Sequence, residues 1–118
     1  MEFSLVKVEV FIPREYINEL RYKLNEIGAL TIGGNYDNCM SYSMVVGSWR
    51  PLEGANPFNG QIGEICEAEE AKVEFCCKVE LIKEVVKIIK IVHPYEVPVI
   101  NILPIINGIL INEILDND

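Results

Sequence analysis

Apolar and charged residues alternate near the N-terminus of the chain, from Phe3 to Ile12. Three valines share one side of this segment, and Lys7 and Glu9 between them share the other. Such alternation is typical of a β-strand with one buried face. Pro13 follows directly, and proline suits the first turn of a helix because its missing N–H would have no partner there. The pattern predicts a strand followed by a helix.

Two segments carry apolar residues at helical spacing, every three or four positions. In the first, which Pro13 opens and Gly28 ends, these residues are Ile17, Leu20, Leu24 and Ile27. In the second, which begins after Val79 and stops near Val92, they are Leu81, Ile82, Val85, Val86 and Ile89. Glycine commonly ends a helix because it adopts the left-handed conformation easily. Both segments are predicted to be helices with one apolar face.

Three further strands are predicted. Met40 to Val46 alternates, with Tyr42, Met44 and Val46 on one face. Residues 65–79 form a long strand, and the glutamates within residues 67–71 leave a break in it open. The fourth strand covers residues 97–103. Between the second and third strands, residues 52–63 are rich in glycine and asparagine and are expected to form a loop.

The element order strand, helix, strand, strand, helix, strand predicts an α+β, ferredoxin-like βαββαβ fold: a four-stranded antiparallel sheet with two helices on one face. We expect one domain over residues 1–118, with a core at about 3–105 and a C-terminal tail at 106–118. The other sheet face should carry Tyr42, Phe75 or their neighbours, and members of the run 100–103. A bare apolar face and an apolar tail predict a homo-oligomer.

Composition and net charge limit the classes of partner that the chain is expected to bind. The 118 residues carry a net charge of −8, which argues against nucleic acid and anionic membrane surfaces, since both are bound mainly through Lys and Arg. No stretch reaches the apolar length of a membrane span, and no signal-like pattern precedes the first strand. The four cysteines include no CxxC pair, and adjacent Cys76 and Cys77 would point to opposite faces of a strand. We expect reduced thiols in a cytoplasmic protein.

Five short motifs follow one another along residues 3–105. They are Gly34, Asn35 and Tyr36 with Cys39; Trp49, Arg50 and Pro51; Gly54, Ala55, Asn56 and Pro57; Gly60 with Gly63; and His93, Pro94, Tyr95 and Glu96. Together they resemble the insertion domain of YqfO-type (NGG-interacting-factor-like) proteins, in which a domain of CutA/PII-like fold interrupts a two-part dinuclear-metal core. The chain looks like a stand-alone copy of that insert. The resemblance implies a trimer with clefts between subunits, and a single histidine cannot supply the metal ligands of the missing core.

The segment between Pro94 and Pro98 is the first candidate site, because His93, Tyr95 and Glu96 bring an imidazole, a phenol and a carboxylate together. His93 and Glu96, joined by Cys39, could bind a divalent metal ion. The alternative is structural: His93 caps the preceding helix, Tyr95 packs, and Cys39 is buried.

A second candidate site combines Arg50 with Gly54 and Asn56 of the glycine-rich loop, which could hold an anion or nucleotide, although the loop has no Walker A or dinucleotide motif. PII-like proteins use the loop between the second and third strands for ligand or partner contacts. Alternatively, this loop rigidly clasps a neighbouring subunit. Asn35 and Tyr36 could present backbone N–H groups to an anion, or simply make a turn.

The sequence therefore predicts a non-enzymatic, oligomeric binding or sensing module. Its inter-subunit clefts would hold a small ligand or a divalent metal ion, and Tyr95, Arg50 and the loop residues would contact the ligand. The alternative is a structural or protein-binding trimerisation module without a ligand. A small enzyme is a third hypothesis, although no Ser-His-Asp or Cys-His arrangement has sequence support.

Overall fold

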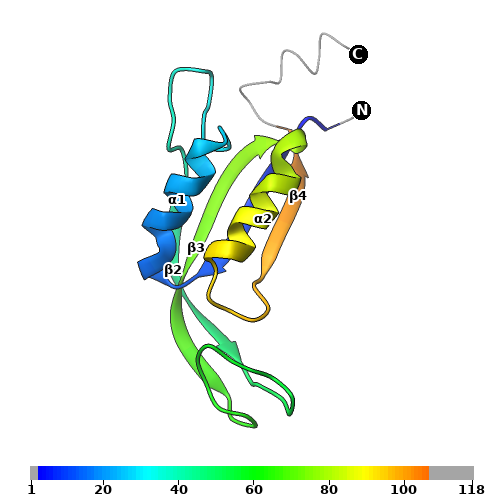
Figure 1. The fold of residues 1–118 in the computed structure, drawn as a ribbon. Helices are drawn as coiled ribbons and strands as arrows, with labels where there is room; N and C mark the ends of the chain where they lie inside the picture. Colours follow the sequence, from blue (N-terminus) through cyan, green and yellow to red (C-terminus); the bar gives the residue numbers. More distant parts are fainter. Residues whose placement is uncertain (1–2, 107–118) are drawn as a thin grey trace.

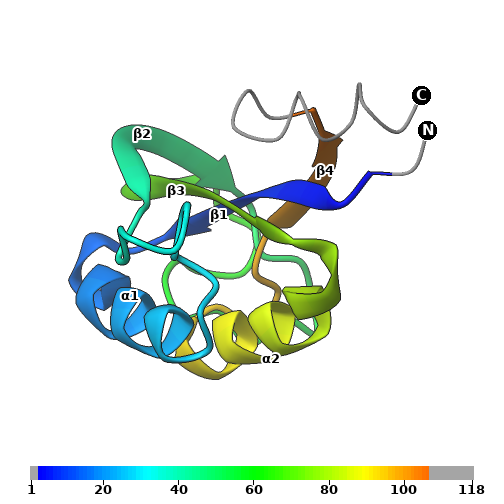
Figure 2. The same cartoon turned by 90° about the horizontal axis from the view of Figure 1, so that it is seen from above.

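A computed structural model of the chain describes residues 3–106. Four strands form one antiparallel sheet in the order β2-β3-β1-β4, and two helices cover one of its faces (Figures 1 and 2). The strands are β1 Leu5–Ile12, β2 Ser41–Trp49, β3 Cys66–Lys78 and β4 Ile100–Ile105. The helices are α1 Ile17–Glu26 and α2 Ile82–Val92, each preceded by a 3-10 turn, Arg14–Tyr16 and Val79–Leu81. The predicted ferredoxin-like α+β fold is confirmed. In residues 3–106, neither helix has the length and apolarity needed to span a membrane.

The core lies between the sheet and the helices. Every second residue of β1 is buried, as the alternation predicted. The buried residues of the other elements complete this layer: Ala71, Val73, Phe75 and Cys77 from β3, Ile17, Leu20 and Leu24 from α1, and Val85, Ile89 and Val92 from α2. Burial of this apolar surface, at about 25 cal/mol per Å², is the main term that favours folding.

The end of α1 shows how local sequence directs the chain. Gly28 has a φ of +79°, and its N–H donates to the carbonyl of Asn25 at 3.0 Å. The N–H of Ala29 donates to the carbonyl of Leu24 at 3.1 Å. These two bonds form a Schellman motif, which satisfies carbonyls at the end of the helix. The predicted role of Gly28 as the helix cap is confirmed.

Strands β2 and β3 continue beyond the rest of the sheet as a two-stranded arm (Figure 1). The pairing of β1 with β3 ends at Ile12 and Ala71, whereas the pairing of β2 with β3 continues to Trp49 and Cys66. No break interrupts β3 within residues 67–71, because each of these residues has a partner on β2. Strand β2 is accordingly longer than the predicted 40–46.

The sheet face away from the helices is less apolar than expected. Phe75 is buried beneath the helices, and Tyr42 shares its side of the sheet because it pairs with buried Val73. At the centre of the open face, Lys7 lies 3.2 Å from Glu74, and Lys72 lies 3.4 Å from the same carboxylate. The hydrogen bond and charge of Lys7 lower the pKa of Glu74, while those of Glu74 raise the pKa of Lys7.

Apolar surface remains at the edges of the sheet. Met44 is 40% exposed and Val46 is 66% exposed on edge strand β2, and Leu103 is 41% exposed on edge strand β4. Leu103 pairs with Lys7 and shares the open face, whereas Met44 pairs with buried Ala71 and lies on the helix side. The open face therefore has a charged centre, with exposed apolar surface at its β4 margin. Of the predicted tail at 106–118, all but residue 106 lies outside the described residues.

Strand β4 begins three residues later than predicted. Its pairing with β1 starts at Ile100, opposite Val10. Continuing the same register would place Pro98 opposite Ile12, and proline has no N–H to give to a strand ladder. Pro104, at the other end, is tolerated because β4 is an edge strand whose outward positions need no partner.

Candidate ligand-binding site

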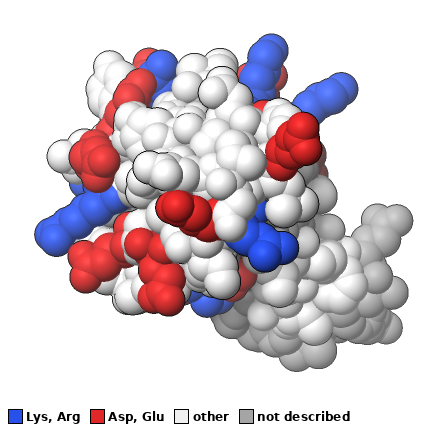
Figure 3. Space-filling model, turned by 90° about the horizontal axis from the view of Figure 1, so that it is seen from below, with Lys and Arg blue, Asp and Glu red and all other residues white. Residues whose placement is uncertain are grey.

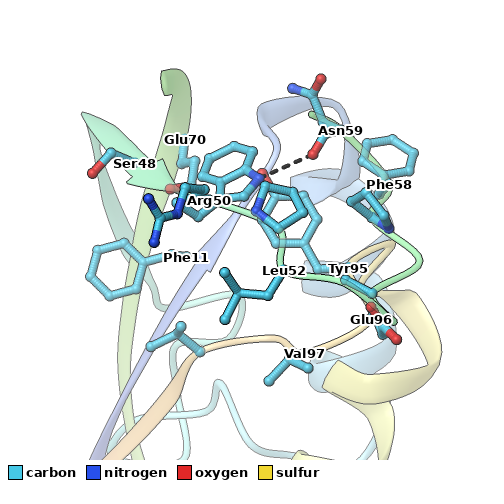
Figure 4. Close-up of a pocket in the computed structure, with 16 residues that line it drawn as sticks. Phe11, Ser48, Arg50, Leu52, Phe58, Asn59, Glu70, Tyr95, Glu96 and Val97 are labelled. Carbon is cyan, nitrogen blue, oxygen red and sulfur yellow. Dashed lines mark hydrogen bonds between the residues drawn. The ribbon is translucent and has the colours of Figure 1, made fainter. Parts of the chain in front are cut away.

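A cavity of about 550 Å³ opens where the arm leaves the body of the sheet (Figure 4). Phe11 lies at the end of β1, Gly47, Ser48 and Trp49 close β2, and Glu70 belongs to β3; these residues form one side of the cavity. Loop residues 50–59 and the segment 95–99 supply the remaining walls. On the face turned toward the arm, the surface is largely uncharged at its centre, with acidic and basic side chains around it (Figure 3).

The glycine-rich loop is tied to its own chain at several points. The carboxylate of Glu96 accepts the backbone N–H of Asn56 at 2.9 Å. The indole Nε1 of Trp49 donates to the carbonyl oxygen of Asn59 at 3.0 Å (Figure 4). The N–H of Gly63 donates to the carbonyl of Pro51 at 2.8 Å. These bonds give the loop a defined path over the cavity, and they use one oxygen of Glu96.

Tyr95 lies at the centre of a group of rings. Its centroid is 4.8 Å from that of His93, 5.8 Å from Trp49 and 5.9 Å from Phe58. Tilted rings at such distances contribute beyond the area that they bury. Burial raises the pKa of Tyr95 to about 12, and the negative charge of nearby Glu70 adds to this effect. The phenol therefore stays protonated at neutral pH.

His93 joins the exit of α2 to the end of β1. Its Nε2 lies 2.5 Å from the carbonyl oxygen of Phe11, and the backbone N–H of Tyr95 donates to its Nδ1 at 3.1 Å. A carbonyl only accepts and an amide N–H only donates, so these partners assign the proton to Nε2 and leave the ring neutral. Burial lowers the pKa of His93, which agrees with a neutral ring. The backbone N–H of His93, at 2.8 Å from the carbonyl of Ile89, closes the helix.

Glu70 is a carboxylate that the sequence did not single out. It is only 6% exposed, yet it lines the cavity. Gly47 on the neighbouring strand leaves room for it: a Cβ at position 47 would lie 1.8 Å from the Oε1 of Glu70. The alternation of a strand could have indicated this burial. Glu67 and Glu69 point to one face of the strand and are exposed, whereas Glu70 points to the other face.

The structure brings together one group of the predicted site residues. Arg50, Tyr95 and Glu96 line the cavity, while Gly54 and Asn56 belong to the loop that covers it. The ring of His93 packs against that of Tyr95. The second predicted site and the segment between Pro94 and Pro98 are thus parts of one site. Sequence reasoning missed its other members, Phe11, Gly47, Phe58 and Glu70.

Asn35, Tyr36 and Cys39 lie elsewhere in the same chain, in the connection between α1 and β2 at the opposite end of α1 from the cavity (Figure 1). Ile32 and Tyr36 exchange backbone hydrogen bonds of 2.8 and 3.3 Å around a tight turn. The Sγ of Cys39 contacts the carbonyl oxygen of Asp37 at 3.5 Å. Within one chain, these residues do not reach His93 or Glu96.

Within residues 3–106, no group of three or more His, Cys, Asp or Glu side chains is arranged to hold a metal ion. A metal ion at His93 would have to replace one of the two hydrogen bonds of the ring, and Glu96 could offer it only the oxygen that Asn56 leaves free. Metal binding through His93, Glu96 and Cys39 stays a prediction. In this chain it requires rearrangement or a second subunit.

The close approach of Gly47 and Glu70 gives a prediction with opposite signs in two backgrounds. Gly47→Ala should destabilise the wild-type protein by about 1 kcal/mol, because the new methyl group forces the end of the buried Glu70 side chain to move. In Glu70→Ala, the same substitution should be neutral or stabilising by about 0.5–1 kcal/mol, because glycine is unfavourable within a strand. Urea unfolding of the four proteins measures this. Equal effects in both backgrounds would contradict the contact.

The neutral ring of His93 gives a pH prediction. The lowered pKa means that the unfolded chain takes up the proton first, at about pH 6.5. The stabilising contribution of the neutral ring should be complete above that pH and should decrease as the pH falls toward the folded pKa. His93 is the only histidine, so no other side chain with an ordinary pKa titrates between pH 5.5 and 7.5. Thermal unfolding at these pH values should show the loss.

Two variants distinguish the effect of protonating His93 from the effect of losing its hydrogen bond to the Phe11 carbonyl. His93→Gln keeps a donor for the Phe11 carbonyl but does not titrate, so it should remove most of the pH dependence in this range. His93→Ala should also destabilise the protein at pH 7.5 by roughly 1–3 kcal/mol, because a buried carbonyl loses its partner. The same pH dependence in His93→Gln as in the wild type would show that this ring is not responsible.

Comparison with known proteins gives matches over nearly the whole chain. Residues 61–110 match the model of a family described as "CutA1 divalent ion tolerance protein". The "GTP cyclohydrolase 1 type 2 homolog" of Bacillus subtilis (strain 168) is 36% identical over 101 residues, which are 86% of this chain and 27% of that protein. The chain thus spans about a quarter of the length of the curated relatives that it matches.

Solved structures agree with this result. A Bacillus cereus protein related to NIF3 superposes with a TM-score of 0.76 and 31% identity, over 89% of this chain and 26% of that one. CutA1 from Shewanella sp. SIB1 gives 0.70 with 18% identity, covering 100% of this chain and 98% of that one. GlnK of B. subtilis gives 0.60 with 20% identity, over 86% and 85% of the two chains. The last two show the fold alone. The predicted resemblance is therefore confirmed: the chain has a CutA/PII-like fold and is similar, over most of its length, to a segment of YqfO-type, NIF3-related proteins.

Proposed function

We propose that this chain is a non-enzymatic binding or sensing module that holds a small ligand in the cavity at the base of the β2–β3 arm. The observation that carries the proposal is the cavity itself. It is about 550 Å³ in volume, within the range of small-molecule sites, and aromatic and aliphatic side chains meet a few polar groups in it. Loop residues 52–63, held by Glu96 and Trp49, form its cover.

We further propose that the module works as a homo-oligomer, as a trimer in the first instance. The exposed apolar residues on the two edge strands support this, because such surface on a small protein commonly marks an interface. The resemblance to CutA and PII supports the same assembly. The four free thiols favour a reducing compartment, and we place the protein in the cytoplasm on that ground.

Native mass spectrometry of protein purified without chelator tests both parts. The expected result is a trimer that carries an additional small mass. Ala55→Phe, which fills the cavity from the loop side, should remove that mass and keep the trimer, whereas the matched Ala55→Ser should keep both. A monomer would contradict the oligomer. A trimer with no bound mass in any variant would favour the alternative, a structural or protein-binding trimerisation module.

A divalent metal ion is the second candidate ligand, favoured by the family match over residues 61–110, which contain His93 and Glu96. If His93 is a ligand, zinc should raise the melting temperature at pH 7.5 and lose this effect as the pH falls below 6.5 toward the lowered pKa of the ring, where protons compete with zinc for the imidazole. At a hundredfold excess over the dissociation constant, zinc should stabilise the protein by about 2.7 kcal/mol. An undiminished response in His93→Gln would exclude His93 and leave the thiols, Cys39 first.

A further inference from the structure

Two opposite charges in the cavity have no ion-pair partner among the described residues. All ion pairs between residues 3 and 106 involve other side chains, on the open sheet face and on α1. Arg50 is exposed at the wall of the cavity, and Glu70 is 6% exposed in its floor. A carboxylate so far removed from water is costly unless a positive group or hydrogen-bond donors compensate it. The phenol of Tyr95 is one hydrogen-bonding neighbour of Glu70, but no positive side chain among the described residues forms an ion pair with it.

The positions of these two residues restrict what can compensate them. Both lie on the β2–β3 side of the cavity, while Glu96 lies on the opposite side, beneath the loop (Figure 4). Glu96 already accepts the N–H of Asn56. The charged groups of the cavity that have no ion-pair partner among the described residues are therefore one carboxylate and one guanidinium, both on the β2–β3 side.

The rest of the cavity is apolar. Phe11, Trp49 and Tyr95 present rings, and Leu52, Val97 and Val99 present aliphatic groups. Aromatic faces also attract an ammonium group, which adds to the attraction of a carboxylate. The lining thus suits a ligand with an apolar body and, at one end, a cation and an anion close together.

We propose, on the basis of the proposed function, that the cavity binds a zwitterion of the α-amino-acid type with an apolar side chain. Its ammonium group pairs with Glu70, its carboxylate pairs with Arg50, and its side chain lies against Trp49, Tyr95 and Leu52. Gly47 has a specific part in this arrangement, because the absence of a side chain there keeps the Glu70 carboxylate within the cavity.

Four probes with the same phenyl group test the charges one at a time: phenylalanine, phenethylamine, 3-phenylpropionate and 3-phenylpropanamide. They are zwitterionic, cationic, anionic and neutral, respectively. Trp49 is the only tryptophan in the chain and lines the cavity, so its fluorescence reports binding at this place. Isothermal titration calorimetry gives an independent affinity. The expected result is that phenylalanine binds at least tenfold more tightly than each of the other three.

Two variants that each remove one charge assign the charges to residues. Glu70→Gln should weaken phenylalanine and phenethylamine at least tenfold and leave 3-phenylpropionate unchanged. Arg50→Met should weaken phenylalanine and 3-phenylpropionate and leave phenethylamine unchanged. This crossed pattern would not arise from a general loosening of the fold, which would weaken all four probes together.

Failure of this inference and failure of the proposed function give different results. If the neutral amide binds as tightly as phenylalanine, the assignment of a zwitterion is overturned and a small-molecule cavity remains. If neither phenylalanine nor the amide binds at millimolar concentration, and the native mass spectrum shows no bound mass, both proposals are overturned.

Discussion

The end of β1 at Ile12 is the constraint on which the site depends. Pro13 cannot continue the strand, so β3 loses its neighbour on that side while its pairing with β2 continues for five more residue pairs, from Glu70 to Cys66. The arm formed in this way leaves a hollow beside it. The pairing of β1 with β4 also stops short, at Val10, which leaves the Phe11 carbonyl free for the ring of His93. Pro13 thus opens the cavity, and Pro98, which keeps β4 from starting earlier, leaves free the carbonyl that anchors the segment 95–99.

Most of the fold could be predicted from the sequence because it follows from local rules. Alternation identified β1, helical spacing identified both helices, and Gly28 marked a helix end by its conformational freedom. The register in which the strands pair could not be predicted. Period-2 alternation leaves the ends of strands open, so the length of the arm and the late start of β4 became clear only when the strands were paired. The charged centre of the open face has the same origin, since it depends on which residues of β1 and β3 lie opposite one another.

The candidate site was predicted only in part for a related reason. Tyr95, Glu96 and Arg50 are conspicuous in the sequence because prolines, glycines and the only histidine surround them. Glu70 is not, because a third glutamate in an acidic cluster looks like a solvated strand. Its burial depends on the absence of a side chain 23 positions earlier in the chain, at Gly47. Contacts that join distant positions leave no local pattern, so reasoning from spacing alone passes over them.

The ion pairs on the open face bear on assembly. Lys7, Lys72, Glu9 and Glu74 already neutralise one another within one chain. A surface of this kind can be covered by a second copy without leaving an unpaired charge, provided that the network stays intact. The exposed apolar surface at the β4 margin, which includes Leu103, would then supply the attraction, and the charged centre would fix the relative orientation of the copies.

The close contact between Gly47 and Glu70 has a consequence for how sequences of this kind diverge. The two positions share one small volume across adjacent strands, so a side chain added at position 47 displaces the end of the one at position 70. A chain that acquires a side chain at position 47 must shorten or redirect the one at position 70, and the cavity then loses its acidic floor. Covariation between these two columns, in an alignment of chains with this arm, would therefore distinguish lineages that keep a negative charge in the cavity from those that have replaced it.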